Sequence, residues 1–247
     1  MALRPQLAAV CSLLALGVLA AAPSEEVTVT GRLIVTEGTQ GENPRGAADA
    51  VVWLSPMTPS VRPASWTGGD TSPRRLRLVQ KHKRFDPHIL VVPLGSLVEF
   101  PNDDPVFHNV FSLFEGKCFD LGLYEAGSSR TVRFDRAGIC YIFCNIHPEM
   151  SAVVVVVEMP YYAVADKSGT VTIPQVPPGQ YRLHVWYERS LPEFLSSLTR
   201  EVTIAADSAS LGTIPLKEIR GIGITHKNKY GRDYDAAAPP GPLYQQP

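Results

Sequence analysis

The sequence CYIFCNIHPEM, Cys140 to Met150, places two cysteines, a histidine and a methionine within eleven residues. It can be interpreted as a metal site, as a disulfide region or as a buried strand that is rich in sulfur. Its second half has the spacing Cys-x2-His-x2-Met over Cys144, His147 and Met150. These three residues are too close together to share one face of a flat strand. They would converge if the strand ended near Cys144 and Pro148 helped to fix a tight turn.

A thiolate, an imidazole and a thioether together favour a soft metal, copper above all. A trigonal site needs a second imidazole from elsewhere in the chain. His108, in the stretch PVFHNVF, is the best candidate because it opens a predicted strand just after the turn PNDDP. Two histidines, one cysteine and a weak axial methionine are the ligand set of blue copper electron-transfer sites. The sequence therefore predicts one copper ion held by His108, Cys144, His147 and Met150.

Three other interpretations of this stretch are less favoured. If Cys144 were a structural thiol and His147 an ordinary loop histidine, the spacing of the four candidate ligands would be unexplained. Zinc binds cysteine and histidine, but methionine is a poor zinc ligand. Cys140 and Cys144 with the following histidine are similar to the dinuclear copper centre of cytochrome oxidase, but two residues rather than three separate Cys144 from His147. The two cysteines would also lie about 13 Å apart on an extended strand, which favours a mononuclear site.

The segment from about Leu76 to Glu158 resembles a cupredoxin of the plastocyanin, amicyanin and pseudoazurin kind. The matching stretches are FDPHILVVPLGSLVEFPNDDPVFHNV, GICYIFCNIHPEM and AVVVVVE. This resemblance implies the same four copper ligands, with Asn109 joining the two ligand loops by hydrogen bonds. It also implies that the edge of His147 reaches the surface inside an apolar patch, where electrons enter and leave.

Cysteine usage leaves one pairing open. Cys118, Cys140 and Cys144 remain beyond the first 22 residues, and an odd number leaves at least one thiol unpaired. An idle thiol is not expected to persist in an oxidising compartment, whereas a metal would hold it as thiolate. Cys140 either packs in the core or forms a disulfide with Cys118, and the spacing does not decide between them.

Residues 1–22 have the pattern of a secretory signal peptide. Arg4 is the only charge before Glu25, and an apolar run from about Leu7 to Ala20 is followed by small residues. This run is too short and too weakly flanked for a good membrane anchor, so we expect a periplasmic or secreted protein without a stable span. The formal net charge is −1, or −2 without residues 1–22. A nearly neutral chain has no general attraction to nucleic acid.

The rest of the chain also has β patterning. Short alternating segments are separated by turn formers, among them 22 prolines and 19 glycines, and LPEFLSSL at 191–198 is the only short helix expected. The sequence therefore predicts an all-β fold. The stretches VTVTGRLIV and ADAVVWLSP, together with ADKSGTVTIPQVPPGQYRLHVWYE, resemble the two halves of a carboxypeptidase-regulatory or transthyretin-like sandwich.

This second resemblance implies a discontinuous sandwich of residues 26–57 plus 160–216. A cupredoxin Greek-key β-sandwich, residues 76–158, would be inserted in it, since surface loops with close ends tolerate insertion. Alternatively, the N-terminal strands pack beside the cupredoxin sheet as an extension. Within the sandwich, DKSG predicts a hairpin. Residues 217–247 are expected to form a flexible tail, because they are polar and then rich in proline.

The expected function is outer-sphere electron transfer by a type 1 copper protein with a protein redox partner. No open coordination position is implied, so we do not expect an enzyme. Six basic residues between Arg74 and Arg84 form either a solvated edge or a docking patch for an acidic partner. The alternative functions are a non-redox module that binds a glycan or a protein, and a copper carrier with a labile site.

Overall fold

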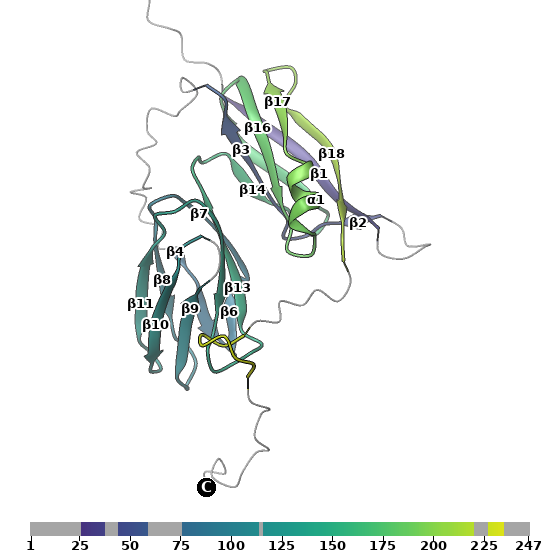
Figure 1. The fold of residues 1–247 in the computed structure, drawn as a ribbon. Coiled ribbons are helices and arrows are strands. Elements are labelled where there is room, and N and C mark those ends of the chain that lie inside the picture. The colour runs from purple at the N-terminus through teal and green to yellow at the C-terminus, as the bar shows by residue number, and fades with distance from the viewer. Residues whose placement is uncertain (1–25, 38–43, 59–75, 114–115, 220–226, 235–247) are drawn as a thin grey trace, which may run out of the picture.

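The computed structural model describes residues 26–37, 44–58, 76–113, 116–219 and 227–234 (Figure 1). Nearly all regular structure in these ranges is β, which confirms the predicted fold class. The described residues contain no helix with the length and apolar character needed to cross a membrane. Residues 1–22, the expected signal peptide, lie outside the described ranges. The strands form two bodies, which we name the split sandwich (β1–β3 with β14–β18) and the central sandwich (β4–β13).

The split sandwich consists of two sheets. One has the order β15-β1-β18 with β2 beside β1, and the other has the order β14-β3-β16-β17. Leu33, Leu54 and Leu183, from β1, β3 and β16, are fully buried in one apolar cluster between these sheets. The helix α1 (Pro192–Ser197) packs on it through the buried Leu195. The strands are β1 (Val27–Glu37), β2 (Arg45–Gly46), β3 (Val51–Pro56), β14 (Tyr162–Val164), β15 (Thr170–Val176), β16 (Gly179–Trp186), β17 (Arg200–Ile204) and β18 (Ser210–Lys217).

The central sandwich packs a sheet of order β10-β9-β12-β13-β7 against a sheet of order β11-β8-β4, and β5 and β6 form a hairpin beside them. Phe100, Val110 and Ile142, from β8, β9 and β12, are fully buried between the two sheets. The strands are β4 (Leu76–Arg77), β5 (Val79–Lys81), β6 (Arg84–Asp86), β7 (Ile89–Pro93), β8 (Leu97–Pro101), β9 (His108–Ser112), β10 (Phe119–Tyr124), β11 (Ser129–Arg133), β12 (Gly138–Phe143) and β13 (Ser151–Val157).

The valine run of β13 joins the two sandwiches. Successive side chains of a strand point to opposite faces. Val154 and Val156 accordingly belong to the core of the central sandwich, whereas Val153 and Val155 belong to the core of the split sandwich. A strand buried on both faces has no polar side to mark in its sequence, which explains the unbroken run. β13 therefore contributes one face to each of two separate apolar cores.

The split sandwich is assembled from the two ends of the chain. β3 pairs with β14 and β16, and β1 pairs with β15 and β18. Among the described strands, none of β1–β3 pairs with a strand of the central sandwich. The N-terminal strands thus find their partners in the C-terminal part, and the central sandwich interrupts the split one in sequence.

The turn at DKSG differs from the prediction. The carboxylate of Asp166 accepts hydrogen bonds from the N–H groups of Ser168 (2.8 Å) and Thr170 (2.9 Å), so a turn does form. However, β14 and β15 belong to different sheets, and the turn crosses between layers instead of closing a hairpin. Gly169 permits this crossing, because its φ is +81° and a Cβ there would collide with the carbonyl oxygen of Leu33. Local turn chemistry specified the reversal but not which sheet receives the next strand.

Candidate metal centre

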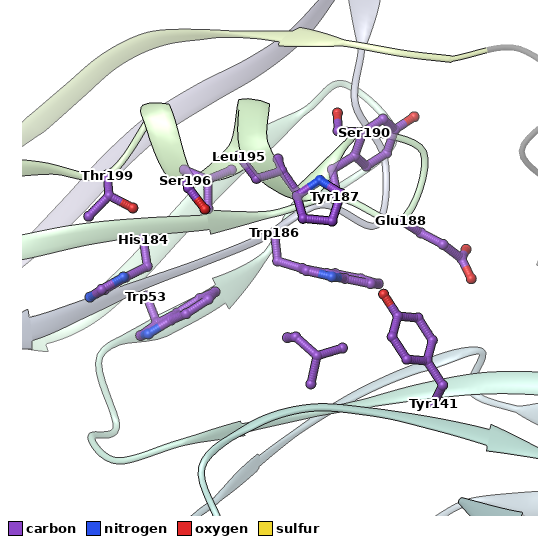
Figure 2. Close-up of a pocket in the computed structure, with 13 residues that line it drawn as sticks. Trp53, Tyr141, His184, Trp186, Tyr187, Glu188, Ser190, Leu195, Ser196 and Thr199 are labelled. Atoms are coloured by element: carbon purple, nitrogen blue, oxygen red, sulfur yellow. The ribbon is translucent and has the colours of Figure 1, made fainter. Parts of the chain in front are cut away.

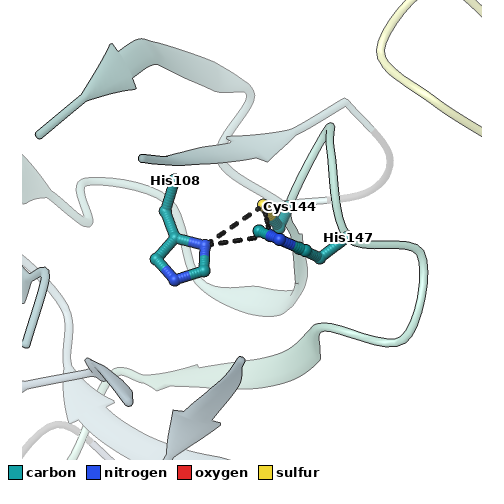
Figure 3. Close-up of side chains that lie close together, drawn as sticks. All are labelled: His108, Cys144 and His147. Atoms are coloured by element: carbon teal, nitrogen blue, oxygen red, sulfur yellow. Dashed lines mark hydrogen bonds between the residues drawn. The ribbon is translucent and has the colours of Figure 1, made fainter. Parts of the chain in front are cut away.

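Three of the predicted ligands come together in the central sandwich (Figure 3). His108 is the first residue of β9, whereas Cys144 and His147 lie in the loop after β12. The Nδ1 atoms of the two histidines are 3.1 Å apart, and the Cys144 Sγ atom is 3.8 Å from Nδ1 of His108 and 3.6 Å from Nδ1 of His147. These atoms form the one cluster of metal-binding side chains found among the described residues.

The ligand loop is closed by its own main chain. The N–H of Met150 donates to the carbonyl oxygen of His147 (3.0 Å), and the N–H of Cys144 donates to that of Met150 (3.2 Å). Pro148 is the second residue of the resulting turn, a position that its fixed φ favours. β13 then begins at Ser151, paired with Phe143 at the end of β12. Met150, the fourth predicted ligand, is fully buried in the same apolar cluster as Cys144.

The size of the cluster suits a metal ion. The two Nδ1 atoms and Sγ form a triangle whose centre lies roughly 2.0 Å from each corner, close to the about 2.0–2.3 Å at which proteins hold metals through nitrogen and sulfur. His108 and Cys144 are fully buried and His147 is half-buried. A soft thiolate with two imidazoles is a donor set that suits copper. The residues present therefore fit the predicted ion.

A buried carboxylate, absent from the sequence prediction, orients His108. Asp104 Oδ2 lies 2.8 Å from Nε2 of His108. Because a carboxylate only accepts hydrogen bonds, Nε2 carries the proton and Nδ1 presents its lone pair to the cluster. Such a carboxylate fixes the tautomer of a metal-binding histidine and increases its basicity. The position of Asp104 four residues before His108, in the loop that precedes β9, is the only local signal for this role.

The same carboxylate is held by the β5–β6 hairpin. The main-chain N–H groups of His82 and Lys83 donate to Asp104 at 2.6 and 2.8 Å. Both residues have positive φ, 55° and 54°, as the two central residues of a type I′ turn require. Burial would raise the pKa of Asp104, but hydrogen bonds from Lys83, His108 and His82 outweigh it and lower that pKa. Asp104 is therefore an anion that links the hairpin to the ligand.

Asn109 lies between the two ligand segments, where the resemblance placed it. Its Oδ1 atom accepts a hydrogen bond from the N–H of Asn145 (3.3 Å), and its Nδ2 group donates to Asp120 Oδ1 (2.7 Å). The side chain is almost completely buried. It thus connects β9, which carries His108, with the loop that carries Cys144 and His147.

Burial and neighbouring charges set the protonation of the metal-free cluster. Burial raises the pKa of the Cys144 thiol. Burial also lowers the pKa of His147, and the nearby His108 and Lys83 lower it further. A neutral His147 is the form that binds a metal. Phe107 and Ile146, in the loops beside the histidines, are 57% and 42% exposed, so apolar side chains reach the surface next to the site.

Part of the expected flexible tail contacts the ligand loop, which corrects that prediction. Residues 227–234, yellow in Figure 1, lie against the central sandwich. The hydroxyl of Tyr234 donates to the carbonyl oxygen of Cys144 (2.8 Å), and the N–H of Lys229 donates to Asn145 Oδ1 (2.9 Å). The composition of the segment gave no sign of these contacts, because they join residues 84 and 90 positions apart.

The disulfide between Cys118 and Cys140 is absent. Both thiols are free, Cys118 exposed and Cys140 fully buried. The Cys140 Sγ atom instead accepts a hydrogen bond from the N–H of Lys117 (2.8 Å). Cys140 therefore takes the alternative that the sequence left open and packs in the core of the central sandwich.

The other predicted histidines have structural environments. His184, expected on a half-exposed sheet face, stacks on Trp53 with ring centroids 5.0 Å apart and an angle of 9°. His88 bridges the carbonyl oxygen of Ser151 and the carboxylate of Glu188. His226 lies outside the described residues.

A cleft of about 230 Å³ lies where the two sandwiches meet (Figure 2). Trp53, His184 and Trp186 line it from the split sandwich, and Tyr141 lines it from the central sandwich. The carboxylate of Glu188 and the hydroxyl of Ser190 add polar groups at its edge. Aromatic faces beside a few polar groups are typical of small-molecule binding sites.

Comparison with known proteins gives two kinds of match. Residues 157–210 match the family model described as polysaccharide lyase family 4, domain II. The chain is also similar to the purple cupredoxin from Nitrosopumilus maritimus, at 24% identity over 33% of this chain and 99% of that one, with a TM-score of 0.31. Amicyanin from Paracoccus versutus is 21% identical over 36% of this chain and 86% of that one, with a TM-score of 0.32.

A copper-containing nitrite reductase from Thermus scotoductus SA-01 is 23% identical over 34% of this chain and 22% of that one, with a TM-score of 0.33. These three solved structures each cover about a third of this chain. No curated protein sequence matches it.

Proposed function

We propose that the chain holds one copper ion between His108, Cys144 and His147, with Met150 as a weak axial ligand, and that it transfers electrons. The observation that carries this proposal is the convergence of two Nδ1 atoms and one Sγ atom on a space of metal-ion size. A histidine, cysteine and methionine donor set is that of blue copper electron-transfer sites. When bound, copper would supply a one-electron couple between its two oxidation states.

The residues around the site would keep its geometry constant while the charge changes. Asp104 holds the ring of His108 through Nε2, and the turn at Pro148 holds His147 and Met150 relative to Cys144. Because His108 and Cys144 are fully buried, water has little access to the donor atoms from that side. His147 is half-buried, next to the exposed Phe107 and Ile146. We propose that electrons pass through this apolar surface to a protein partner in the periplasm or outside the cell.

The test is an absorption and paramagnetic-resonance spectrum of protein loaded with Cu(II). We expect an intense blue or purple colour from charge transfer by the Cys144 thiolate, and loss of that colour in Cys144→Ser. Cys118→Ser is the matched control, because Cys118 is exposed and takes no part in the cluster. Reversible one-electron voltammetry should accompany the colour. A colourless protein with full copper content would contradict the proposal and favour a copper carrier.

A second candidate function is glycan binding by the cleft of Figure 2. Two observations favour it. The match to polysaccharide lyase family 4, domain II, spans the segment that contributes Trp186, Glu188 and Ser190 to the cleft. The rings of Trp53 and Trp186 also line the cleft, and aromatic rings offer flat apolar faces to a sugar ring.

Titration calorimetry with a panel of neutral and uronic-acid oligosaccharides tests this candidate. We expect binding to the wild-type protein with or without copper and its loss in Trp186→Ala. The exposed Phe107→Ala, next to the metal cluster, is a control that leaves glycan binding unchanged. Absence of binding to the whole panel would eliminate this candidate without affecting the copper proposal.

A further inference from the structure

We infer that the C-terminal segment 227–234 is a structural part of the metal site, in which Tyr234 and Lys229 are positioning residues for the cysteine ligand loop. This inference rests on the proposed function for its consequence, but the docking itself is a property of the metal-free chain. The segment follows the last strand of the split sandwich, and it reaches across to the ligand loop of the central sandwich.

Tyr234 acts on the cysteine ligand itself. Its hydroxyl donates to the carbonyl oxygen of Cys144 at 2.8 Å. The N–H of Cys144 is already bonded to the carbonyl oxygen of Met150, so Tyr234 supplies the remaining main-chain partner at this residue. Both main-chain polar groups of the ligand are therefore fixed, one by the loop and one by the segment.

Lys229 completes a closed ring of hydrogen bonds around the site. Its N–H donates to Asn145 Oδ1 (2.9 Å), and its Nζ group donates to Asp120 Oδ2 (2.8 Å). The N–H of Asn145 donates to Asn109 Oδ1, and Asn109 Nδ2 donates to Asp120 Oδ1. The ring joins β9, β10, the ligand loop and the C-terminal segment. Without Lys229 the ring is open, and the Oδ1 atom of Asn145 loses the N–H group that donates to it in this network.

The segment has a defined conformation of its own. Asn228 Oδ1 accepts hydrogen bonds from the N–H groups of Tyr230 (3.0 Å) and Arg232 (3.1 Å). The N–H of Asn228 donates to the carbonyl oxygen of Arg232 (2.8 Å), and Gly231 has a φ of +74°. This compact turn presents Lys229 to the ring. The docking thus depends on a preformed local structure rather than on a chance contact of an extended chain.

The consequence of this docking is a stiffer ligand loop. Release of a buried ion requires the loop with Cys144 and His147 to move away from His108, and this opening breaks the bonds from Lys229 and Tyr234. Each such hydrogen bond contributes about 1 kcal/mol, so its loss speeds opening about fivefold. The segment should therefore slow the exchange of copper and hold the ligands in one arrangement through a redox cycle.

The first experiment uses the metal-free protein, so that its result does not depend on copper. Hydrogen exchange at the amides of Cys144 and Asn145 is compared between wild type, Tyr234→Phe and a chain that ends at residue 226. We expect about fivefold faster exchange in Tyr234→Phe and more than tenfold faster exchange in the truncated chain. Equal exchange in all three proteins would overturn the inference that the segment docks.

The second experiment measures the rate of copper transfer to a chelator. It also measures the reduction potential of the bound copper and the copper hyperfine splitting in the paramagnetic-resonance spectrum. Tyr181→Phe is the matched control, because the Tyr181 hydroxyl also donates to a main-chain carbonyl oxygen, that of Pro177 (2.7 Å), in the split sandwich. We expect about fivefold faster copper transfer and a shifted potential in Tyr234→Phe. Tyr181→Phe should lower the free energy of unfolding but leave copper transfer, the reduction potential and the hyperfine splitting unchanged.

The two proposals can fail separately. If wild type binds copper without type 1 spectra but its exchange depends on the segment, the function is wrong and the docking stands. If wild type has type 1 spectra while Tyr234→Phe matches Tyr181→Phe in potential, splitting and copper transfer, the positioning role is wrong. If both variants change these properties equally, a general loss of stability explains the effect and the positioning role is likewise wrong.

Discussion

The two sandwiches share the strand β13 but differ in what else they bury. Eight buried polar side chains occur among the described residues, and the split sandwich contributes only Ser190. The core of the split sandwich is built from aliphatic side chains, one methionine and aromatic rings. The other seven polar side chains belong to the central sandwich: Gln80, Ser96, Asn102, Asp104, His108, Asn109 and Ser112.

This difference shows that the destabilising burial of polar groups is concentrated in the sandwich that holds the metal cluster. A buried polar group is destabilising unless it is hydrogen-bonded, whereas an apolar side chain stabilises simply by leaving water. Asp104, His108 and Asn109 are buried in or beside the metal cluster, and each is hydrogen-bonded to a neighbouring residue. The split sandwich buries only one such side chain, that of Ser190. We infer that it contributes stability through the shared valine strand β13, while the central sandwich holds the chemistry.

The largest effect on stability is expected in the split sandwich. Leu183→Ala removes a fully buried side chain between its sheets and should lower the free energy of unfolding by about 2–5 kcal/mol. Leu97→Ala, at a position that is 52% exposed, is the control and should change it little. Denaturant unfolding of the metal-free protein measures both. A changed copper spectrum in Leu183→Ala would show that the two interiors are not separable.

The next effect concerns the polar interior of the central sandwich. Asp104→Asn replaces the anionic acceptor of His108 by a neutral one and should weaken Cu(II) binding about 10–100-fold. The reduction potential should rise, because a negative charge beside the ligand favours the more highly charged oxidised ion. Competition titration and voltammetry measure these changes. Asp103→Asn changes an exposed neighbour and is the control. An equal effect there would show that Asp104 acts only through its negative charge and not through its hydrogen bond to His108.

The smallest effect is a pH dependence at the contact between the sandwiches. Nε2 of His88 lies 2.8 Å from Glu188, and Nδ1 lies 3.1 Å from the carbonyl oxygen of Ser151, so both nitrogens face acceptors. The hydrogen bond to Glu188 raises the pKa of His88 against the opposing effect of burial, and the charge of Asp49 adds to the rise. The stabilisation by the His88–Glu188 pair is therefore complete below about pH 6.5, the pKa of histidine in the unfolded chain. It is lost as the pH rises through the higher pKa of His88 in the folded protein.

His88→Gln should lower the melting temperature at about pH 5.5 and leave it nearly unchanged at about pH 8. The difference is expected to stay below about 1 kcal/mol, because the pair is partly exposed and solvent screens it. Glu188→Gln should give the same pattern. A loss of equal size at both pH values would show that packing, rather than charge, sets this contact.

Much of the central sandwich was predictable because its signals are local. Short apolar segments separated by turn formers indicated the strands around the cluster, and the spacing of Cys144, His147 and Met150 indicated a ligand loop. Pro148 occupies the turn as expected. His108 was chosen because it opens a predicted strand just after the turn PNDDP. Each of these inferences used residues within one strand and its turn.

The two contacts missed at the metal cluster join distant parts of the chain. The role of Asp104 depends on a hairpin about twenty residues earlier, and that of Tyr234 on a loop 90 residues away. The disulfide between Cys118 and Cys140 was left open because spacing does not report the direction of two thiols. The hairpin at DKSG was wrong because a turn motif does not choose between two sheets.

The strands, the ligand types and their order follow from local sequence, since periodicity and donor chemistry are properties of neighbouring residues. Three features required the folded chain: which face of the valine strand meets which core, which carboxylate orients His108, and where the C-terminal segment lies. Those outcomes depend on the free energy of packing between elements far apart in the chain, which a local sequence pattern does not indicate.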